Sequence, residues 1–455
     1  MPAKSKLSKI KKLPKELLVD PATREKYAGD KWFARSLPDA VALPKDAAEV
    51  AAILRFAHKN NIPVTARGSG YGYVGGCVPV KGGIVLSLEK MNRIREIHAK
   101  DFVAVVEPGV LTADLQKAVE EKNLFYPPDP ASRADSSIGG NIATNAGGPR
   151  CLKYGVTRDY VLGLDVVLAD GTFLKLGSRT HKNKSGFDLH RLFVGSEGLL
   201  GVVTGATLKL LPKPPDRALL SCGFSTIADA SKTIDLIFEN GYLPCALEIA
   251  DRFTLRAAEK RTGSKKLAGC DSILMVEIDG QKNAVNGDLA ALEKIIQSQK
   301  PVFIDKAIGA AECEKLWQVR REFSYALRDT GLTKLNEDIT VPRGRLTDLL
   351  AFSSGLEKRF GFPVACFGHA GDGNIHVNVM VDLEKKGSRK KSDKVLDALF
   401  GQIVAWGGVI TGEHGIGLAK KPWWPLAASR EVRELHVRIK KSLDPKGLLN
   451  PGKFI

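Results

Sequence analysis

The stretch RGSGYGYVGG, residues Arg67–Gly76, is the most informative segment of this 455-residue chain for its fold. It contains the spacing G-x-G-x-x-G, which marks a Rossmann dinucleotide site only where it opens a helix. The chain continues instead as GCVPVKGGIVLSL, whose proline and paired glycines leave no room for a helix. We therefore predict a loop between two strands, at Ile62–Ala66 and Ile84–Leu88, rather than a Rossmann turn.

A second glycine-rich stretch, IGGNIATNAGG at Ile138–Gly148, follows about 70 residues later. Without Cβ atoms, successive N–H groups can converge on an anion and let a pyrophosphate approach the backbone. Two such loops could hold a large phosphorylated cofactor from two sides; the alternative is that both are tight turns. The surrounding segment, Pro127–Gly148, is so rich in small residues that we expect no regular secondary structure there.

Length and composition predict a globular α/β or α+β enzyme with more than one domain. The chain exceeds the size at which a single core stops growing, and it is 44% hydrophobic with 45 glycines. The proline-rich LLPKPPD at Leu210–Asp216 is the best candidate for a linker. Apolar spacing predicts helices at Ala47–Lys59, Thr112–Lys122, Ala284–Gln299 and Leu346–Phe360, with Thr112 as the N-cap of the second. It predicts strands at Phe102–Gly109 and Ser272–Gly280, and a strand–turn–strand unit at Val161–Gly177 around Asp170-Gly171.

The net charge of +17 gathers partly in residues 4–15 and 385–394. Nucleic-acid binding would call for interleaved aromatics or a recognisable motif, and neither is present. We interpret the excess as solvated basic surface and predict no nucleic-acid partner, with an anionic membrane surface or an acidic redox partner as the alternative. No apolar run is long enough to span a membrane, and the lysine-rich start lacks the apolar stretch of a secretory signal.

Seven scattered cysteines with no C-x-x-C argue against a structural zinc knot or an iron–sulfur cluster in this chain. An odd, scattered set is typical of reduced, buried thiols in a cytosolic protein. We expect a cytoplasmic location, with peripheral contact to the inner membrane as the alternative.

Histidines fall in two glycine-flanked motifs. In FGHAGDGNIHVNV, residues 367–379, the G-D-G-N turn predicts a hairpin with His369 before the turn and His376 after it. Asn378 would share a face with His376. In TGEHGIG, residues 411–417, Glu413 and His414 adjoin. Two imidazoles and a carboxylate suit a divalent metal with an open position. The alternative is that each histidine is a structural residue whose hydrogen bonds are satisfied within the protein.

The first half of the chain resembles FAD-binding domains of the vanillyl-alcohol-oxidase (PCMH-type) family. The resemblance rests on PVTARGSGYGYVGG, VEPGV, PPDPASRADSSIGGNIATNAGG, KYGVTRDYVLGLDVVLADG and GFDLHRLFVGSEGLLGVVT, in that order. It implies a two-domain α+β fold: a basic segment at 1–35, a PCMH-type FAD-binding domain at 36–214, an α+β substrate (cap) domain at 215–445 and a C-terminal strap at 446–455 that returns to the FAD domain.

By this resemblance the two glycine loops hold FAD. The implied cofactor contacts are Arg67, Gly68, Ser69, Gly70, Tyr71, Gly72, Ser137, Gly140, Asn141, Asn145, Gly147, Gly148, Glu197, Val202 and Asn450. Relatives usually carry a threonine and a small or aliphatic residue where this chain has Tyr71 and Tyr73. Some members attach FAD covalently through a histidine, at the place that Tyr71 occupies here, so we expect non-covalent FAD.

The histidine motifs resemble the D-lactate dehydrogenase, glycolate oxidase flavin subunit and D-2-hydroxyglutarate dehydrogenase group, through H-x-G-D-G-N-x-H-x-N followed by G-E-H-G. The resemblance implies zinc or manganese on His369, His376 and Glu413, with His414 as general base. LWQVRREF places Arg320, and KLNEDITVP places Lys334, at the substrate carboxylate beside Asn378. An ordinary helix-face arginine and a solvated lysine are the alternatives.

These parts imply oxidation of a small D-2-hydroxy acid to a 2-oxo acid, with hydride passing to flavin N5. The sequence leaves open the side chain of the acid, the oligomeric state and the electron acceptor, which could be oxygen, a quinone, a cytochrome, an electron-transfer flavoprotein or an iron–sulfur subunit. Two other functions stay open: ether formation without net redox, as in the related alkylglycerone-phosphate synthases, and nucleic-acid binding without catalysis.

Overall fold

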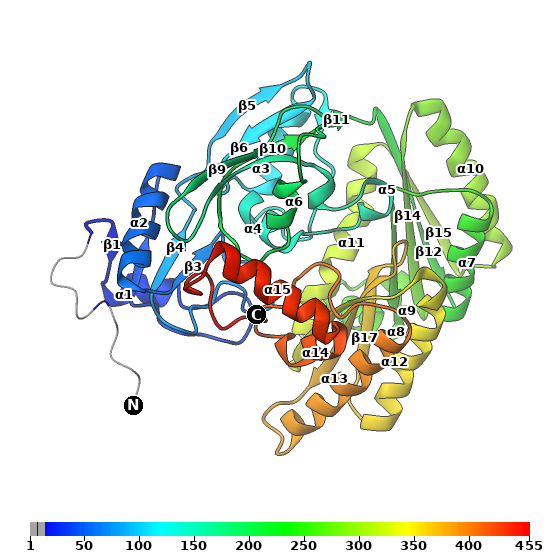
Figure 1. The fold of residues 1–455 in the computed structure, drawn as a ribbon. Coiled ribbons are helices and arrows are strands. Elements are labelled where there is room, and N and C mark those ends of the chain that lie inside the picture. The colour runs from blue at the N-terminus through cyan, green and yellow to red at the C-terminus, as the bar shows by residue number, and fades with distance from the viewer. Residues whose placement is uncertain (1–6, 8–13) are drawn as a thin grey trace. The chain divides into compact units, whose positions relative to one another are not determined.

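The computed structural model describes residue 7 and residues 14–455, so most of the N-terminal lysine run lies outside the described residues. The chain forms two compact units. Unit 1 comprises Met1–Gly147, Val156–Lys213 and Glu413–Ile455, and unit 2 comprises Gly148–Gly155 and Pro214–Gly412. Helices and sheets are mixed in both (Figure 1).

Unit 1 is built on two main sheets. The first has the order β1 (Leu17–Leu18), β2 (Ala40–Ala42), β4 (Ile84–Ser87), β3 (Val64–Arg67), with β2, β4 and β3 parallel. The second is antiparallel, in the order β5 (Ile94–His98), β6 (Val103–Val106), β10 (Val202–Lys209), β8 (Val161–Val167), β9 (Phe173–Gly177). β7 (Leu124–Phe125) pairs with β11 (Leu211–Pro212). The helices are α1 (Pro21–Lys26), α2 (Ala47–Asn60), α3 (Thr112–Glu120), α4 (Ile138–Thr144), α6 (Leu189–Phe193), α14 (Trp424–Ala427) and α15 (Arg430–Leu443).

Helix α2 connects the parallel strands β2 and β3 and buries one apolar face against them. Val50, Ile53, Leu54 and Ala57 recur at helical spacing and pack in one core cluster with the strand residues. Asp46 caps the helix at its N-terminus, and Asn61 ends it in the left-handed conformation. The predicted helix and the predicted loop between β3 and β4 are therefore confirmed.

Two local predictions were wrong. The N-cap of α3 is Leu111, not Thr112, because the hydroxyl of Thr112 is engaged with the carbonyl of Ser136 and with Asn141. The segment expected to be irregular contains α4, which the Ser137 side chain caps by accepting from the N–H of Gly140. Small residues are needed in this helix because a Cβ on Gly139 would lie 2.6 Å from Pro108.

Unit 2 is built on one sheet of seven strands. Their order is β15 (Phe303–Ile308), β12 (Asp216–Phe224), β14 (Ser272–Gly280), β13 (Ala246–Asp251), β17 (Val364–His369), β18 (Asn374–Val381), β16 (Thr333–Thr340), and all pairs are antiparallel. The helices are α5 (Cys151–Tyr154), α7 (Ile227–Glu239), α8 (Arg252–Thr262), α9 (Lys265–Ala268), α10 (Lys282–Ser298), α11 (Ala310–Arg328), α12 (Leu346–Phe360) and α13 (Ser388–Ala405).

Helices α8 and α11 cover one face of this sheet. Their apolar residues, among them Leu255 and Phe323, share a core cluster with Ala250, Phe367 and Met380 of the strands. The same strands carry polar side chains on this face at two-residue intervals, including Glu248 beside Ala250. The covered face therefore holds both the core and the candidate site.

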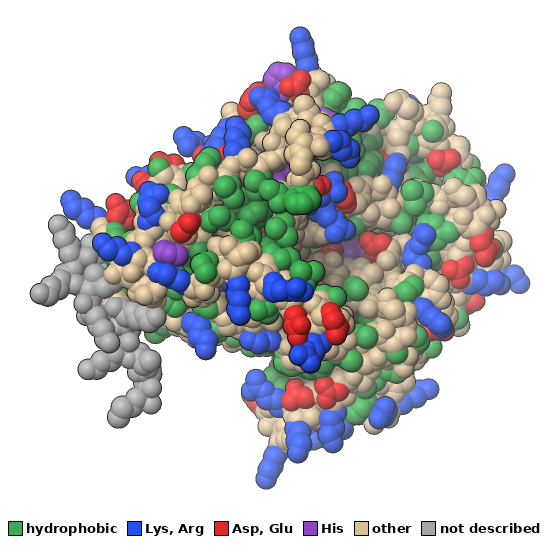
Figure 2. Space-filling model, viewed as in Figure 1, with side chains coloured by type: hydrophobic (Ala, Val, Ile, Leu, Met, Phe, Trp, Pro, Cys, Tyr) green, Lys and Arg blue, Asp and Glu red, His purple; other side chains and the backbone are tan. Residues whose placement is uncertain are grey.

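All seven cysteines are free thiols, and five of them are buried as expected. Cys77 and Cys151 are only partly buried, so the expectation of burial was wrong for these two. Among the described residues, no helix combines the length and apolarity that crossing a bilayer requires. On the face shown in Figure 2, Lys and Arg side chains are scattered among acidic and neutral ones rather than gathered in a continuous band.

Candidate active site

The predicted hairpin that carries the two histidines is formed by β17 and β18. His369 is the last residue of β17 and pairs with Asn374, while His376 pairs with Phe367 and Asn378 with Ala365. The turn between the strands needs Gly373, whose φ is +82° and where a Cβ would lie 2.1 Å from the carbonyl oxygen of Val341. The hairpin prediction is confirmed.

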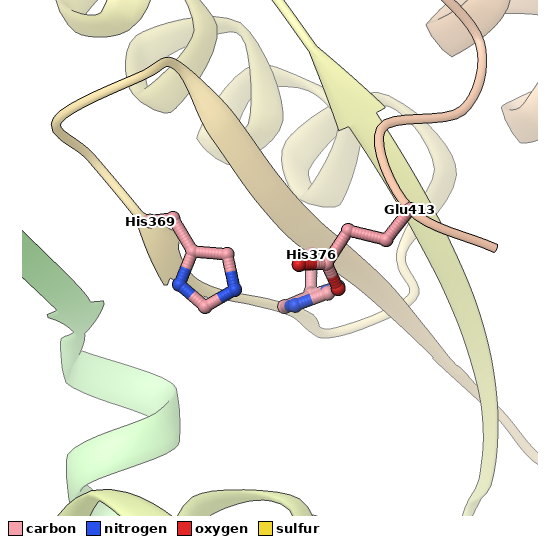
Figure 3. Close-up of side chains that lie close together, drawn as sticks. All are labelled: His369, His376 and Glu413. Carbon is pink, nitrogen blue, oxygen red and sulfur yellow. The ribbon is translucent and has the colours of Figure 1, made fainter. Parts of the chain in front are cut away.

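Glu413 joins the two histidines. One ligand atom from each of His369, His376 and Glu413 lies within 4.8 Å of the others. In Figure 3 the two rings and the carboxylate converge, with a ring nitrogen of His369 directed towards His376. Two imidazole nitrogens and one carboxylate oxygen are a donor set that suits zinc or manganese and leaves positions open, so the residues fit a divalent metal.

Asp338 of β16 fixes the segment that leads to Glu413. Its Oδ2 accepts hydrogen bonds from the Thr411 hydroxyl at 3.1 Å and from the N–H of Gly412 at 3.0 Å. Its Oδ1 accepts from the side-chain amide of Asn374, at the start of β18, at 2.7 Å. Asp338 is fully buried and pairs with His376 across the strands. The residue before Glu413 is thus attached to the same sheet as both histidines.

Glu248 of β13 contacts both His369 and Arg320. Its Oε1 accepts from Nδ1 of His369, and its Oε2 accepts from Nε of Arg320 at 2.6 Å. The Arg320 guanidinium also lies 4.7 Å from the centre of the Phe367 ring. Burial alone would raise the pKa of Glu248, but the charges of His369 and Arg320 outweigh it and lower that pKa to about 2.

Lys334, the second predicted contact for a substrate carboxylate, lies on β16 and is half-buried. Its Nζ donates to the hydroxyl of Ser324, four residues after Arg320 on α11. Burial, followed by the charges of Arg328 and Arg320, lowers the pKa of Lys334 to about 8. A bound anion would relieve the repulsion between Lys334 and these two arginines.

Asn378 lies on the same side of β18 as His376. Its side-chain amide donates to the carbonyls of Ala365 at 3.1 Å and His376 at 2.9 Å. Its Oδ1 is buried and has no hydrogen-bond partner among the described residues. An acceptor in that state can take a hydrogen bond from a ligand hydroxyl.

In unit 1 the structure brings the two glycine loops together. The N–H of Ser69 donates to Oγ of Ser137 at 3.3 Å, and a Cβ on Gly68 would lie 2.5 Å from that same oxygen. The glycines at 70, 72 and 140 lie in this pair of segments. The guanidinium of Arg67 packs against Gly70, where a Cβ would lie 1.9 Å from Nη2. Its Nη1 donates to the carbonyl of Gly29 at 2.6 Å and to Sγ of Cys77 at 3.2 Å.

The other implied cofactor residues occupy varied positions. Asn141 is buried against Thr112, and Asn145 caps the C-terminus of α4 and accepts from the N–H of Arg158. Val202, the first residue of β10 in the second sheet, is buried in the core cluster that also contains residues of the first sheet. Gly147 and Gly148 stand where the chain passes from unit 1 to unit 2, and Lys31 lies 4.7 Å from the ring centre of Tyr71.

Glu197 organises the loop that contains His414. Its carboxylate accepts from the N–H groups of Ile416 at 2.7 Å and Gly417 at 2.8 Å. Burial raises the pKa of Glu197, and these two hydrogen bonds oppose the rise. The ring of His414 lies against that of Tyr73, with centroids 5.4 Å apart. Both oxygens of Glu197 are thus used by this loop.

The C-terminal strap runs beside β3. Val64 bridges to Leu449, and the N–H of Asn450 donates to the carbonyl of Val64. The side-chain amide of Asn450 donates to the carbonyls of Glu197 and Gly76, while its buried Oδ1 has no partner among the described residues. A buried acceptor next to a glycine loop fits the N–H donor of a flavin ring, so these residues fit FAD.

Three residues of the site were not found from the sequence. Glu248 and Asp338 are acids within strands, Asp338 directly after Glu337, and an acid in a strand is the signal that could have drawn attention to them. Tyr73 was noted only as a departure from relatives, not as a neighbour of His414.

The fold and these two sites define a flavin-linked oxidoreductase. Two family descriptions match the chain: an FAD-binding domain at residues 38–177 and the C-terminal domain of FAD-linked oxidases at residues 213–454. The chain belongs to the FAD-linked oxidase family, with the two-domain α+β, PCMH-type fold that the sequence predicted.

Curated relatives extend over nearly the whole chain. The glycolate oxidase subunit GlcD of Bacillus subtilis (strain 168) is 39% identical over 420 residues, covering 92% of this chain and 89% of that protein. A D-lactate dehydrogenase of Anaerostipes hadrus is 34% identical over 467 residues, covering 98% and 96%. Among solved structures, 4-ethylphenol oxidase of Gulosibacter chungangensis shares the fold, with a TM-score of 0.78 at 21% identity over 96% of this chain and 94% of that one.

Proposed function

We propose that the protein oxidises a small D-2-hydroxy acid, of the D-lactate, glycolate or D-2-hydroxyglutarate class, to the corresponding 2-oxo acid. The observation that carries this proposal is the convergence of His369, His376 and Glu413 within 4.8 Å. The names of the relatives, glycolate oxidase subunit and D-lactate dehydrogenase, support the same substrate class.

His369, His376 and Glu413 would hold zinc or manganese. When bound, such an ion lowers the pKa of a substrate hydroxyl and fixes its orientation. Glu248 keeps the proton of His369 on Nδ1, which leaves Nε2 as the ligand atom. Asp338 holds Gly412, so that Glu413 can complete the ligand set without reordering its loop.

Arg320, Lys334 and Asn378 would bind the rest of the substrate. Arg320 uses Nε for Glu248, and its outer nitrogens can form a fork with the substrate carboxylate. Lys334 adds a second positive charge, and Oδ1 of Asn378 can accept from a hydroxyl. These contacts would select a carboxylate with an adjacent hydroxyl.

His414 would accept the hydroxyl proton. Oxidation of the alcohol removes two electrons and two protons: the C2 hydrogen leaves as hydride and the hydroxyl hydrogen as a proton. Bound FAD supplies the two-electron acceptor at N5. Tyr73 packs on the ring of His414, and Glu197 holds the following residues, so the base would be presented in a fixed orientation.

Reoxidation needs an acceptor outside this chain: oxygen, a quinone, a cytochrome, an electron-transfer flavoprotein or an iron–sulfur subunit. A cytoplasmic location, with or without peripheral membrane contact, belongs to the same proposal.

The test is anaerobic reduction of the purified yellow protein. D-Lactate, glycolate and D-2-hydroxyglutarate are each mixed with it, and the absorbance at about 450 nm, the flavin band of this cofactor class, is followed. We expect at least one acid to bleach the band and its L-isomer, where one exists, to leave it unchanged.

Chelation separates the metal from the flavin. Dialysis against a chelator is expected to abolish bleaching, and zinc or manganese to restore it. The proposal fails if none of the acids bleaches the metal-loaded protein, which would favour the ether-forming chemistry of the alkylglycerone-phosphate synthases. Full turnover after verified metal removal would show that the three ligands are wrongly assigned.

A further inference from the structure

We infer that Glu248 is a positioning residue that orients the metal ligand His369 and the substrate-binding Arg320 through one carboxylate, and so couples metal binding to carboxylate recognition. This inference rests on the proposed function for the roles of His369 and Arg320. The inference links metal binding at His369 to substrate binding at Arg320, which the proposed function treats as independent.

The carboxylate of Glu248 is buried, and both of its oxygens accept hydrogen bonds. Its side chain is 1% exposed, and among the described residues Oε1 accepts from Nδ1 of His369 and Oε2 accepts from Nε of Arg320. The two partners come from different elements, the end of β17 and the middle of α11. Glu248 itself pairs with His369 across adjacent strands, so the backbone holds the carboxylate in place.

Each hydrogen bond to Glu248 fixes the orientation of one side chain of the proposed site. A carboxylate on Nδ1 selects the imidazole tautomer whose Nε2 lone pair can bind a metal, and it sets the rotation of the ring. A bond to Nε of Arg320 fixes the plane of the guanidinium, which also lies over Phe367. The ring of Phe367 in turn lies 5.4 Å from that of His376. A shift of the carboxylate would therefore move both functional groups.

The alternative role of these contacts is to hold α11 on the sheet. The chain contains a second buried glutamate that contacts α11 and serves as a control. Glu277 is also fully buried, on β14, and accepts from Trp317 of α11, three residues before Arg320. It also pairs with Arg150 at 3.1 Å. Glu277 thus equals Glu248 in burial, charge and attachment to the same helix, but it contacts no predicted metal ligand.

The first experiment compares Glu248→Gln with Glu277→Gln. Each holoprotein is stripped of metal with FAD retained, and Zn²⁺ and Mn²⁺ affinities are measured by competition with a chromophoric chelator. Both variants should melt at a lower temperature than the wild type. We expect Glu248→Gln to weaken metal binding by about 10–100-fold, the usual effect of losing a carboxylate behind a histidine ligand, and Glu277→Gln to leave it unchanged.

The second experiment tests the link to Arg320. Binding of oxalate, a small inert dicarboxylate, is measured by calorimetry with and without Zn²⁺. Glu248→Gln should weaken oxalate binding even in the metal-free protein, and the gain in oxalate affinity on adding Zn²⁺ should be smaller than in the wild type. Glu277→Gln should retain both. If Glu248→Gln does not fold, Glu248→Asp, which keeps the charge but retracts it, should show the same losses to a smaller extent.

The outcomes separate this inference from the proposed function. Equal metal and oxalate affinities in Glu248→Gln and Glu277→Gln would reduce Glu248 to a structural ion pair and overturn the inference. A wild type that binds metal but is bleached by no hydroxy acid would overturn the proposed function alone, and the metal titration would still test Glu248. A wild type that binds neither ion overturns both.

Discussion

The N–H of Gly412 donates to Oδ2 of Asp338 at 3.0 Å. The two residues are 74 positions apart in the chain, yet this bond fixes the backbone immediately before Glu413. The other oxygen of Asp338 holds Asn374, next to the turn that separates His369 from His376. One buried carboxylate therefore ties together the segments that carry all three predicted ligands.

Replacing Asp338 by Asn should loosen this arrangement. The amide cannot accept at both positions, so at least one buried donor loses its partner, at a cost of about 1–3 kcal/mol. We expect a lower melting temperature and weaker Zn²⁺ binding, because Glu413 is no longer held. Thr411→Val, which removes one hydrogen bond to the same oxygen, should lower stability by only about 0.5–1.5 kcal/mol. Undiminished zinc affinity in Asp338→Asn would show that Glu413 needs no such support.

FAD should be bound tightly but without a covalent bond. The loop between β3 and β4 has Tyr71 where some relatives carry the attachment histidine, and no histidine occurs between His58 and His98. Acid precipitation should release all yellow colour into the supernatant. Colour that stays with the pellet after repeated washing would identify another attachment residue.

Lys334 should give kcat/KM a dependence on pH. Its pKa is lowered to about 8, so the ammonium form is lost from the free enzyme as the pH rises through that value. A neutral amine forfeits a charge-assisted hydrogen bond to the substrate carboxylate, worth about 1.5–3 kcal/mol, so kcat/KM should fall roughly 10–100-fold above pH 8. Lys334→Met should be impaired at pH 7 and show no further fall; a parallel decline in both proteins would assign the titration to another group.

The same lysine predicts how stability changes with pH. Its folded pKa lies below the ordinary value of 10.5, so between these values the unfolded chain binds more protons than the folded one. The contribution of Lys334 to the free energy of unfolding should therefore rise with pH from about 8 to 10.5. Urea unfolding at pH 7 and at pH 10 should show this rise in the wild type and a smaller one in Lys334→Met.

The hairpin of β17 and β18 could be predicted because its signals are local. The sequence G-D-G-N specifies a turn, and alternation in the flanking residues sets which side chains share a face. Helix α4 could not be recognised in the same way. Its glycines indicate a loop, and it forms because Ser137 caps one end, Asn145 adopts the left-handed conformation at the other, and Gly139 packs closely on Pro108.

Glu248 and Asp338 show why part of the site was missed. Their partners are distant in the chain: His369 lies 121 residues from Glu248, and Thr411 lies 73 from Asp338. The register of the seven-stranded sheet creates these contacts, and no single segment of the sequence predicts the order of its strands. An acid in an apolar strand predicts that a partner exists, but it does not say which.

His414 provides the sharpest test of the proposed chemistry, because it adjoins Glu413 in the chain. Glu413 lies in the candidate ligand group with His369 and His376, whereas the ring of His414 lies against Tyr73. The chain bends at residues 412–414, so the two side chains do not follow the alternation of a strand; their different neighbours are the reason to expect different roles. Gly415, with φ at +84° and no space for a Cβ beside Glu197, bends the chain just after them.

Replacing His414 by Asn should leave FAD and metal content intact and slow flavin reduction by about 10²–10⁴-fold, the usual contribution of a positioned general base. Glu413→Ala should instead lose metal together with activity, and Tyr73→Leu should slow reduction only modestly, because it removes packing and not the base. Anaerobic stopped-flow mixing with a bleaching hydroxy acid measures all three, beside metal analysis of each protein. Normal reduction by His414→Asn would refute the assignment of the base, and loss of metal from that variant would make His414 a ligand.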